Sequence, residues 1–390
     1  MGIVGLCVFS NELCNFVMTK RYSVHEHLWW ICFHTGRMAL PQAPARRFAS
    51  DNAAGAHPVV MDALLRCNDG HQLAYGADDY TLQAESAFNG LFDRDVVTRF
   101  VYGGTGANVF ALACMLQPAQ AVICTDWSHI TVDETGAPER LLGAKLIDLP
   151  SPNAKLVPNQ IRDQAHLLGS EHHVQPGVVS LTQATELGTL YTAEEVTEIC
   201  KVAHEMGMLV HMDGARIAHA TAALGGTRDA LRAFTCDAGV DVLTFGGMKA
   251  GGVFGEAVIF FNRPLADRSK YIRKQLTQLH SKMRFISAQY LALLNDDLFI
   301  SLGRQSNSGA ARLYEKLHHI DSLNLHSPPA ANSLFPTLSP ADKQALQDWS
   351  FFWDWDEKAG QVRWMTGWDV TDGDVDQFAA GVLEQLNKHV

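Results

Sequence analysis

The chain has 390 residues, of which 47% are hydrophobic and 19% are charged, so it can bury a large core in more than one domain. Its formal net charge of −11 argues against a broad basic surface for nucleic acid, and no apolar run reaches the ~18 residues of a membrane-spanning helix. Eight cysteines without a C-x-x-C pair predict reduced thiols in a cytoplasmic protein, and neither a disulfide framework nor a bound metal.

Residues 1–47 are expected to form an N-terminal extension. Their apolar patches, residues 3–10 and 28–33, are short and do not form the single apolar stretch of a signal peptide. We therefore expect either a poorly ordered segment or a start codon placed too early, with Met38 as the next candidate start. Organised folding is expected to begin near Phe48.

From residue 97 to residue 261, short β-branched runs alternate with amphipathic stretches of helical length. Seven strands are predicted, at residues 97–102, 121–124, 145–148, 177–181, 208–212, 240–245 and 257–261. The helices expected among them include residues 107–116, 158–168, 193–206 and 227–233. Thr192 precedes two glutamates and predicts the N-cap of one helix. This order predicts an α/β fold with a mainly parallel seven-stranded sheet, in a large domain of residues 48–290.

The remaining residues, 291–390, predict a smaller α/β domain. A basic passage at residues 263–294 leads into it and predicts one long helix or a broken one. Inside the domain, the pattern indicates a strand at residues 362–365, a turn at 369–374 and a final helix to Lys388. Because ligands collect at the carboxyl ends of parallel strands, residues that directly follow the strands of the large domain are the expected site of chemistry.

The first such strand end is residues 103–108 (GGTGAN), which open a helix. Small residues let backbone N–H groups approach a phosphate, and the helix N-terminus favours an anion there. The spacing fits neither a Walker A loop nor a dinucleotide fingerprint, so Gly104, Thr105 and Gly106 predict a site for a single phosphate on a small cofactor. The alternative is that the glycines only make a tight strand-to-helix connection.

The second strand end carries Asp213, in the segment 209–216 (LVHMDGAR). A buried carboxylate needs a partner, and a protonated pyridine nitrogen would be one, since holding that proton makes the ring an electron sink. The alternative is an aspartate that caps the next helix or pairs with Arg216.

The third strand end carries Lys249, in the glycine-rich segment 244–252 (TFGGMKAGG). Partial burial lowers the pKa of a lysine and frees its amine for imine formation with an aldehyde. A phosphate turn, a strand-end aspartate and a glycine-flanked lysine, each after its own strand, together predict a pyridoxal 5′-phosphate (PLP) site.

His129, in the segment 125–130 (TDWSHI), follows another predicted strand. Its ring could stack on a planar cofactor and handle protons, and the acidic run at residues 133–137 (DETGA) could orient it. The alternative is a structural or exposed histidine.

Several segments together resemble the low-specificity L-threonine aldolases, which belong to the fold-type I, β-eliminating-lyase group of PLP enzymes. The segments are residues 48–52 (FASDN), 74–76 (AYG), 104–108 (GTGAN), 211–216 (HMDGAR), 245–249 (FGGMK), 256–258 (EAV) and 281–285 (SKMRF). The resemblance runs in this order from Phe48 to the C-terminus and is strongest to the pseudomonad-type branch. It implies a fold-type I, PLP-dependent transferase-like architecture.

The resemblance also implies residue roles. Lys249 matches the Schiff-base lysine, Asp213 the partner of the pyridine nitrogen and His129 the ring-stacking histidine. The other implied cofactor contacts come from Gly104, Thr105, Gly106, Arg216 and the phosphate-binding Arg284. The implied substrate contacts come from Ser50 and Arg363, which grip the substrate carboxylate, and from Tyr75, which reaches into a neighbouring subunit's site. A homo-oligomer, a dimer or a tetramer, follows from that last role.

Two departures from the family pattern stand out. Residues 181–186 (LTQATE) lack the second active-site histidine of some members, so the base that takes the substrate's hydroxyl proton is open among His129, a water held by it and Glu186. Met248 replaces the usual hydroxyl residue beside the lysine.

The expected reaction is the retro-aldol cleavage of L-threonine, L-allo-threonine and related substrates, phenylserine among them, to glycine and an aldehyde. Three alternatives remain: another PLP-dependent lyase or racemase on the same scaffold, a cofactor-binding protein without turnover, and a Rossmann-type oxidoreductase, which the glycine spacing disfavours.

Overall fold

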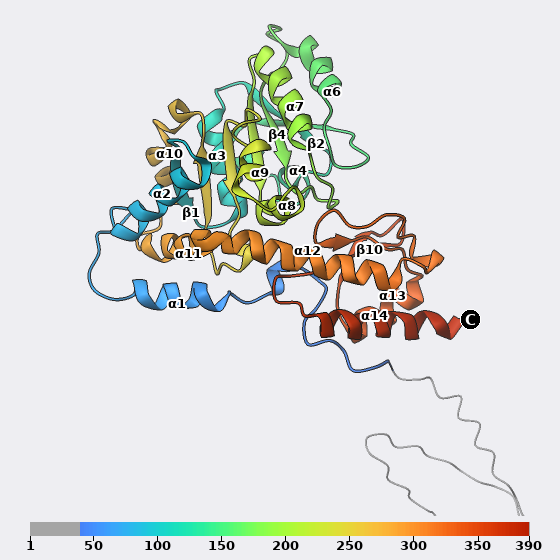
Figure 1. Ribbon diagram of the computed structural model, residues 1–390. Coiled ribbons are helices and arrows are strands. Elements are labelled where there is room, and N and C mark those ends of the chain that lie inside the picture. Colours follow the sequence, from blue (N-terminus) through green and yellow to red (C-terminus); the bar gives the residue numbers. More distant parts are fainter. Residues whose placement is uncertain (1–39, 390) are drawn as a thin grey trace, which may run out of the picture. The chain divides into compact units, whose positions relative to one another are not determined.

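The computed structural model describes residues 40–389, which form an α/β architecture (Figure 1). Residues 1–39 of the expected extension, Met38 included, lie outside the described residues. Residues 40–47 contact the C-terminal part of the chain: Trp349 Nε1 donates to the carbonyl of Pro41 at 2.6 Å, and Arg46 pairs with Asp374 at 3.3 Å. The proposed domain boundaries at residues 47 and 290 stay predictions.

The large sheet contains all seven predicted strands, in the order β1-β7-β6-β5-β4-β2-β3. Their bounds are β1 Val97–Val101, β2 Gln120–Thr125, β3 Lys145–Leu149, β4 Gln175–Thr182, β5 Leu209–Gly214, β6 Val242–Phe245 and β7 Glu256–Phe260. Strands β3, β2, β4, β5 and β6 run parallel, and β7 runs antiparallel to both β1 and β6. The prediction of a mainly parallel sheet is confirmed.

The helices expected between these strands are also present. The described helices are α1 Pro58–Cys67, α2 Asp79–Phe92, α3 Gly104–Met115, α4 His129–Val132, α5 Ala137–Leu142, α6 Pro158–Arg162, α7 Ala193–Glu205, α8 Ile217–Ala223, α9 Arg228–Ala233, α10 Ser269–Gln275, α11 Arg284–Leu294, α12 Leu298–Leu317, α13 Pro340–Trp349 and α14 Asp372–Leu386. Thr192 caps α7 as predicted, because its side chain accepts the N–H of Glu195. The helix expected at residues 158–168 is shorter: α6 gives way to a 3-10 turn, Asp163–Leu167. The basic passage is broken into α10 and α11.

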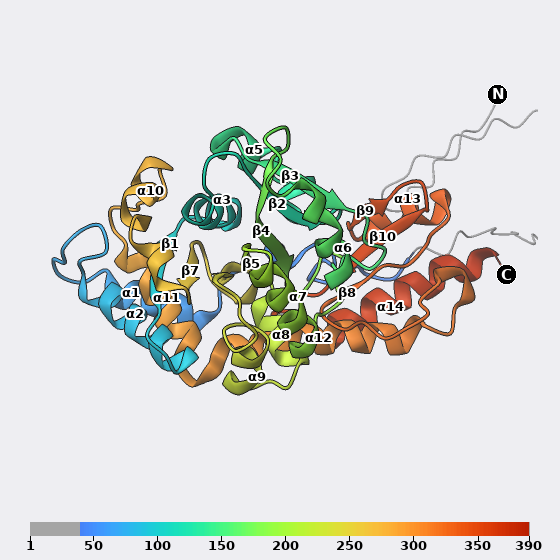
Figure 2. The same cartoon turned by 90° about the horizontal axis from the view of Figure 1, so that it is seen from above.

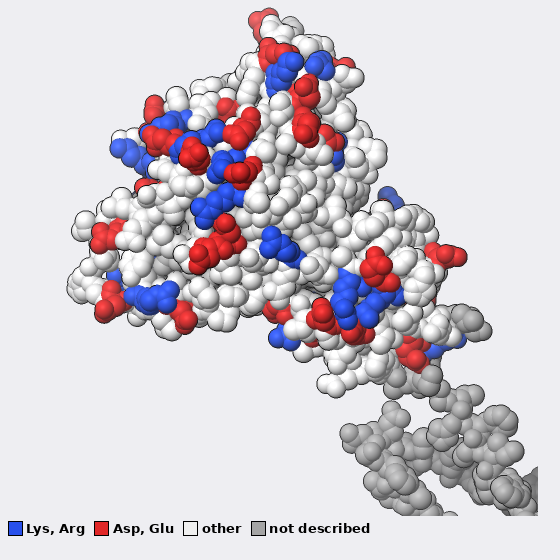
Figure 3. All heavy atoms as spheres, viewed as in Figure 1, with Lys and Arg blue, Asp and Glu red and all other residues white. Residues whose placement is uncertain are grey.

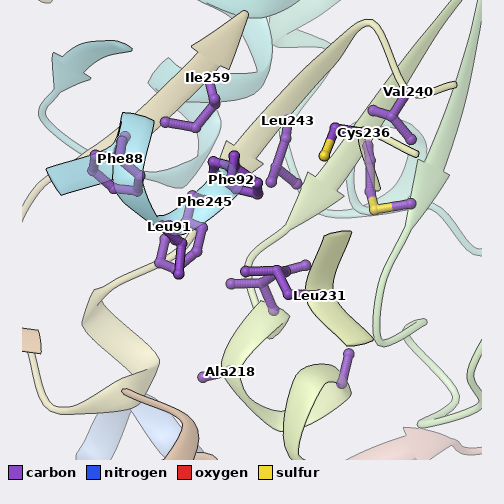
Figure 4. Packing of buried hydrophobic residues seen from close by; sticks show 14 of the residues in the cluster. Phe88, Leu91, Phe92, Ala218, Leu231, Cys236, Val240, Leu243, Phe245 and Ile259 are labelled. Atoms are coloured by element: carbon purple, nitrogen blue, oxygen red, sulfur yellow. The ribbon is translucent and has the colours of Figure 1, made fainter. Parts of the chain in front are cut away.

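Helices cover both faces of the sheet. Successive strand residues point to opposite sides, so each strand contributes side chains to both cores. Val242 and Val258 pack with α3 on one face, whereas Leu243 and Ile259 pack on the other face with helices such as α2 and α9. Figure 2 shows α3 on one side of the sheet and α7 and α9 on the other. Figure 4 shows Phe88 of α2 and Leu231 of α9 approaching the strands on the second face. This two-sided cover holds the carboxyl ends of the parallel strands in fixed positions.

The C-terminal part contains a second sheet, β8-β10-β9, with β8 Ser333–Leu334, β9 Trp353–Asp356 and β10 Gln361–Met365. The predicted strand at residues 362–365 and the predicted final helix are confirmed as β10 and α14. A core around Trp364 and Phe378 joins this sheet to α14. The N–H of Met365 donates to the carbonyl of Phe48, which brings β10 beside the N-terminal part of the described chain.

Among residues 40–389, no helix combines the length and the apolarity that crossing a membrane requires. On the face shown in Figure 3, lysines and arginines are interspersed with aspartates and glutamates. That face therefore offers no continuous basic area for a polyanion.

Candidate active site

The ends of β4, β5 and β6 meet at one edge of the large sheet. Asp213, near the end of β5, is paired in register with Thr182 of β4 and with Thr244 of β6. Two glycines permit this close approach: a Cβ on Gly214 would lie 2.5 Å from the carbonyl oxygen of Thr244, and a Cβ on Gly246 would lie 2.6 Å from that of Ala215. The segments that carry Asp213 and Lys249 are thus brought together, as predicted.

Lys249 lies in a 3-10 turn, Met248–Ala250, directly after β6. Burial lowers the pKa of its amine, and the nearby Arg216 guanidinium lowers it further. This agrees with the expectation for an amine that attacks a carbonyl. Lys249 makes no ion pair with another residue of the described range 40–389, so its amine is not committed to a protein carboxylate.

Glu256 and Tyr290 hold the turn that carries the lysine. The N–H of Gly247 donates to Glu256 Oε2 at 2.8 Å, and the Tyr290 hydroxyl donates to the carbonyl of Phe245 at 3.0 Å. Burial raises the pKa of the Glu256 carboxyl to about 7. The sequence analysis quoted Glu256 but gave it no role, because a glutamate at the start of a strand gives no local sign that it faces a lysine.

Asp213 is buried and accepts two hydrogen bonds. Asn108 Nδ2 donates to Asp213 Oδ2 at 2.8 Å, and the N–H of Ala215 donates to Oδ1 at 2.9 Å. The alternative in which Asp213 pairs with Arg216 is wrong, because Arg216 donates instead to Asp51 at 2.7 and 3.1 Å. The N-cap of α8 is Arg216, so Asp213 does not cap that helix either. Asp213 is left without a cationic partner in the described chain.

Asp51, which sequence reasoning quoted but gave no role, anchors Arg216 near Lys249. Asn332 Nδ2 also donates to Asp51 Oδ2, at 3.1 Å. Burial raises the pKa of Asp51, but the charges of Arg216 and Lys249, with the hydrogen bonds from Arg216, together outweigh it and hold the pKa well below its usual range. Arg216 and Asp51 therefore form an ion pair near Lys249, in which the two charges cancel.

His129 begins α4 and is held at two points. Its Nδ1 lies 2.9 Å from Glu134 Oε1, and its backbone N–H donates to Glu186 Oε1 at 2.8 Å. The hydrogen bond to Glu134 raises the pKa of His129. An ionised carboxylate only accepts, so Nδ1 is the donor, and Nε2 of the neutral ring keeps a free lone pair. The prediction that the acidic run orients His129 is confirmed.

Glu186 contacts the backbone of His129. Its Oε1 accepts from the His129 N–H and, at 2.9 Å, from the hydroxyl of Thr182, while Oε2 is buried and has no partner among residues 40–389. Burial raises the pKa of this carboxyl to about 7. This carboxyl therefore titrates close to neutral pH.

The turn at Gly104–Gly106 forms the N-terminus of α3. Gly103 is the N-cap and offers no side chain, and the first turn contains no acidic residue. The first N–H groups of α3 therefore remain available to an anion. Gln278 lies against this turn, since a Cβ on Gly106 would meet its amide at 2.6 Å. Arg284 does not join it: Nη1 of Arg284 donates to the carbonyl of Gly70 at 3.2 Å.

Arg363, on β10, lies beside Ala49. Its Nη2 reaches the carbonyl of Ala49 at 3.5 Å, and its guanidinium lies 4.9 Å from the ring centre of Trp355. Nε is buried without a hydrogen-bond partner, and burial lowers the pKa of the guanidinium to about 10. Arg363 thus contacts the residue next to Ser50, the predicted pairing of Ser50 with Arg363 stays a prediction, and the described chain supplies no carboxylate that pairs with Arg363.

Tyr75 stands apart from these residues. Its side chain is 53% exposed, and Lys274 Nζ lies 5.4 Å from its ring centre. None of its contacts involves Lys249, Asp213 or Arg363.

The residues of the site fit PLP. Asp213 is a buried carboxylate without a cation, Lys249 has an amine of lowered pKa, and the N-terminus of α3 is free for an anion. The glycine contacts between β5 and β6 set the first two side chains at adjacent strand ends.

Comparison with known proteins gives a consistent result. Residues 47–339 match the beta-eliminating lyase family. The chain is 39% identical to the low specificity L-threonine aldolase of a Pseudomonas species, over 87% of this chain and 97% of that protein. It is 40% identical to the protein of the same name from Pseudomonas aeruginosa, over 83% of this chain and 93% of that one.

Solved structures agree with these matches. The threonine aldolase of Leishmania major superimposes with a TM-score of 0.81 at 32% identity and covers 88% of this chain and 99% of its own. A serine palmitoyltransferase of Sphingomonas wittichii, 14% identical with a TM-score of 0.66 over 87% of each chain, shows the shared fold alone.

Proposed function

Because the chain belongs to the beta-eliminating lyase family and, within it, to the low-specificity L-threonine aldolases, we propose that it cleaves L-β-hydroxy-α-amino acids to glycine and an aldehyde. L-Threonine and L-allo-threonine are the simplest substrates, and phenylserine is a larger one. The observation that carries the proposal is a pair of opposite charges, Asp213 and Arg363, to which the described chain gives no ionic partner. A cofactor with a cationic ring and a substrate with a carboxylate supply both partners.

Bound PLP supplies a conjugated electron sink for the bond that breaks at the substrate's α-carbon. Lys249 offers the amine that attaches the cofactor, and Asp213 holds the proton on the pyridine nitrogen. The N–H groups of Gly104, Thr105 and Gly106 hold the phosphate. His129 covers the ring, while Arg216, already neutralised by Asp51, lies close to Lys249.

Arg363 and Ser50 hold the substrate carboxylate. A guanidinium donates two parallel hydrogen bonds to a carboxylate, and the unpartnered Nε of Arg363 is one donor for them. This grip would hold the substrate in one orientation, which the alignment of the bond that breaks requires.

Among the three candidate bases, the geometry favours His129. Glu134 accepts the Nδ1 proton, which leaves the Nε2 lone pair to take the β-hydroxyl proton. The His129 side chain is 39% exposed, whereas the free oxygen of Glu186 is buried. Glu186 instead fixes the backbone of His129.

Tyr75 and Arg284 are proposed to act across a subunit boundary. Arg284 contacts Gly70, in the loop that also carries Tyr75, and not the Gly104–Gly106 turn of its own chain. Leu65 of α1 and Leu73 of the same loop are 71% and 72% exposed. These apolar side chains support a homo-oligomer, a dimer or a tetramer, with shared active sites.

The proposed location is the cytoplasm. Support comes from five buried cysteines that carry free thiols, Cys67, Cys114, Cys124, Cys200 and Cys236.

Product analysis tests the reaction. Purified protein supplied with PLP is incubated with L-threonine, phenylserine or L-serine, and glycine, aldehydes, pyruvate and D-amino acids are measured. We expect glycine with acetaldehyde from L-threonine, and glycine with benzaldehyde from phenylserine. Pyruvate or D-amino acid without any aldehyde would instead support the second candidate, another PLP-dependent lyase or a racemase on the same scaffold.

A further inference from the structure

We propose that Asn108 is a positioning residue that joins Asp213 and the Glu134–His129 pair into one hydrogen-bonded unit. The geometry holds for the protein alone, and its meaning for catalysis rests on the proposed function. Asn108 lies on α3, one turn after Gly104, so the helix whose N-terminus would hold the phosphate also presents this amide to Asp213.

The amide of Asn108 bridges two carboxylates. Nδ2 donates one hydrogen to Asp213 Oδ2 at 2.8 Å and the other to Glu134 Oε1 at 2.9 Å. Glu134 Oε1 also accepts from Nδ1 of His129 at 2.9 Å. An unbroken chain of three hydrogen bonds therefore runs from Asp213 to His129.

Burial gives this bridge its importance. Asn108 is 1% exposed, Asp213 is 4% exposed, and the side chain of Glu134 is fully buried. Two buried carboxylates that share one neighbourhood repel each other, and the amide of Asn108 gives each of them one N–H donor. Removing the Asn108 amide takes away both N–H donors. We expect the Glu134–His129 pair then to bind one more proton with higher affinity.

The titratable groups that face His129 come from several elements. Glu134 follows on the same segment, Asp213 lies on β5, Glu186 follows β4, and Lys249 follows β6. Among them, the two glutamates accept hydrogen bonds from His129: Glu134 from the ring Nδ1 and Glu186 from the backbone N–H. Of these two, Glu134 is the one linked through Asn108 to Asp213. Asn108 thus gives a hydrogen-bond donor to both carboxylates and links the His129 ring to Asp213 through Glu134.

The test is an NMR titration of the His129 ring in the full-length chain before PLP is added. The ring signals are assigned by their loss in the His129→Gln variant. In Asn108→Leu, which has nearly the same shape but no donors, we expect the pH midpoint of the ring signals to rise by about one unit. In Asn108→Leu combined with Glu134→Gln, the rise disappears, because the neutral amide no longer attracts the extra proton.

Asn332→Leu is the matched control. Asn332 is also buried and donates to a carboxylate, Asp51, so its loss costs comparable stability but leaves the His129 midpoint unchanged. If Asn108→Leu does not fold, Asn108→Asp replaces it, and the added carboxylate must raise the midpoint as well.

An unchanged midpoint in a folded Asn108 variant would show that Asn108 only fills space. Because the titration needs neither cofactor nor turnover, a protein that released no glycine would refute the proposed function without affecting this result, and the reverse also holds.

Discussion

Single residues of the site differ in whether the protein supplies their counter-charge. Asp51 and Arg216 satisfy each other through two short hydrogen bonds, so their charges are cancelled before any ligand arrives. Asp213 and Arg363 have no such partner among residues 40–389. Leaving a charge in a poorly solvated position without a partner costs free energy, which a ligand of opposite charge recovers. These two residues mark where ligand charges belong.

Arg363→Lys tests the carboxylate grip. A lysine keeps the charge but cannot donate two parallel hydrogen bonds, so the KM for L-threonine should rise roughly 10- to 100-fold with a much smaller change in kcat. The visible absorbance of bound PLP should persist, because Arg363 does not hold the cofactor. Arg312→Lys, in an exposed ion pair with Asp376, should change neither quantity. An unaltered KM, or a lost absorbance band, would show that Arg363 has another role.

Glu256→Gln tests whether burial raises the pKa of the carboxyl near Lys249. The pKa of Glu256 rises from 4.5 to about 7 on folding, so the folded chain binds the proton more tightly and wild-type stability falls as pH rises through that window. Glutamine keeps the acceptor for the Gly247 N–H and does not ionise. The variant should therefore gain stability relative to wild type above pH 7, on the order of 3 kcal/mol. Urea unfolding of the cofactor-free wild type and variant, below pH 4.5 and above pH 7, measures their free energies of unfolding. A stability difference between the two proteins that does not change with pH would contradict the account.

Among the elements, α3 contributes most to the site. Its N-terminus opens at Gly104, and Asn108 on its second turn reaches Asp213. Its remaining residues are almost entirely apolar and are buried between the sheet and α10. The position of the phosphate turn is thereby tied to that of Asp213 through one rigid element.

Gly104→Ala tests the phosphate turn. No atom lies within 4 Å of a Cβ placed on Gly104, so alanine should fold without a clash and should not lower stability. With PLP, the added methyl group should still weaken cofactor binding, because it occupies space next to the N–H groups that hold the phosphate. Gly90→Ala, in α2 with equally open surroundings, is the control and should leave PLP affinity unchanged. Equal affinity in both variants would place the phosphate elsewhere.

Sequence patterns predicted the seven strands and the three strand-end residues, because both depend on local periodicity and glycine spacing. They did not predict what each side chain would contact. Asn108 meets Asp213 across 105 positions, and Arg216 meets Asp51 across 165. A polar residue inside the apolar helix that starts at Gly104 is the one local signal that could have identified Asn108. Arg284 was expected at the phosphate by resemblance, and its position beside Gly70 depends on the packing of α11.

At the scale of the whole molecule, exposed apolar side chains on α1 and the loop after it predict association with further copies. Leu65→Glu should reduce the mass measured by light scattering toward the 42.8 kDa of one chain, because it places a charge inside the proposed contact. Leu141→Glu changes another exposed leucine, on α5, and should leave the mass unaltered. A wild-type protein that already runs as a single chain would refute the oligomer.

The central claim is that Lys249 carries the cofactor at the meeting point of β4, β5 and β6. The most direct measurement is borohydride reduction of the PLP-loaded full-length protein, followed by peptide mass spectrometry. The account predicts the reduced cofactor on the peptide that contains Lys249, and none in Lys249→Ala. Cofactor trapped on another lysine, or retained covalently in the Lys249→Ala variant, would contradict it.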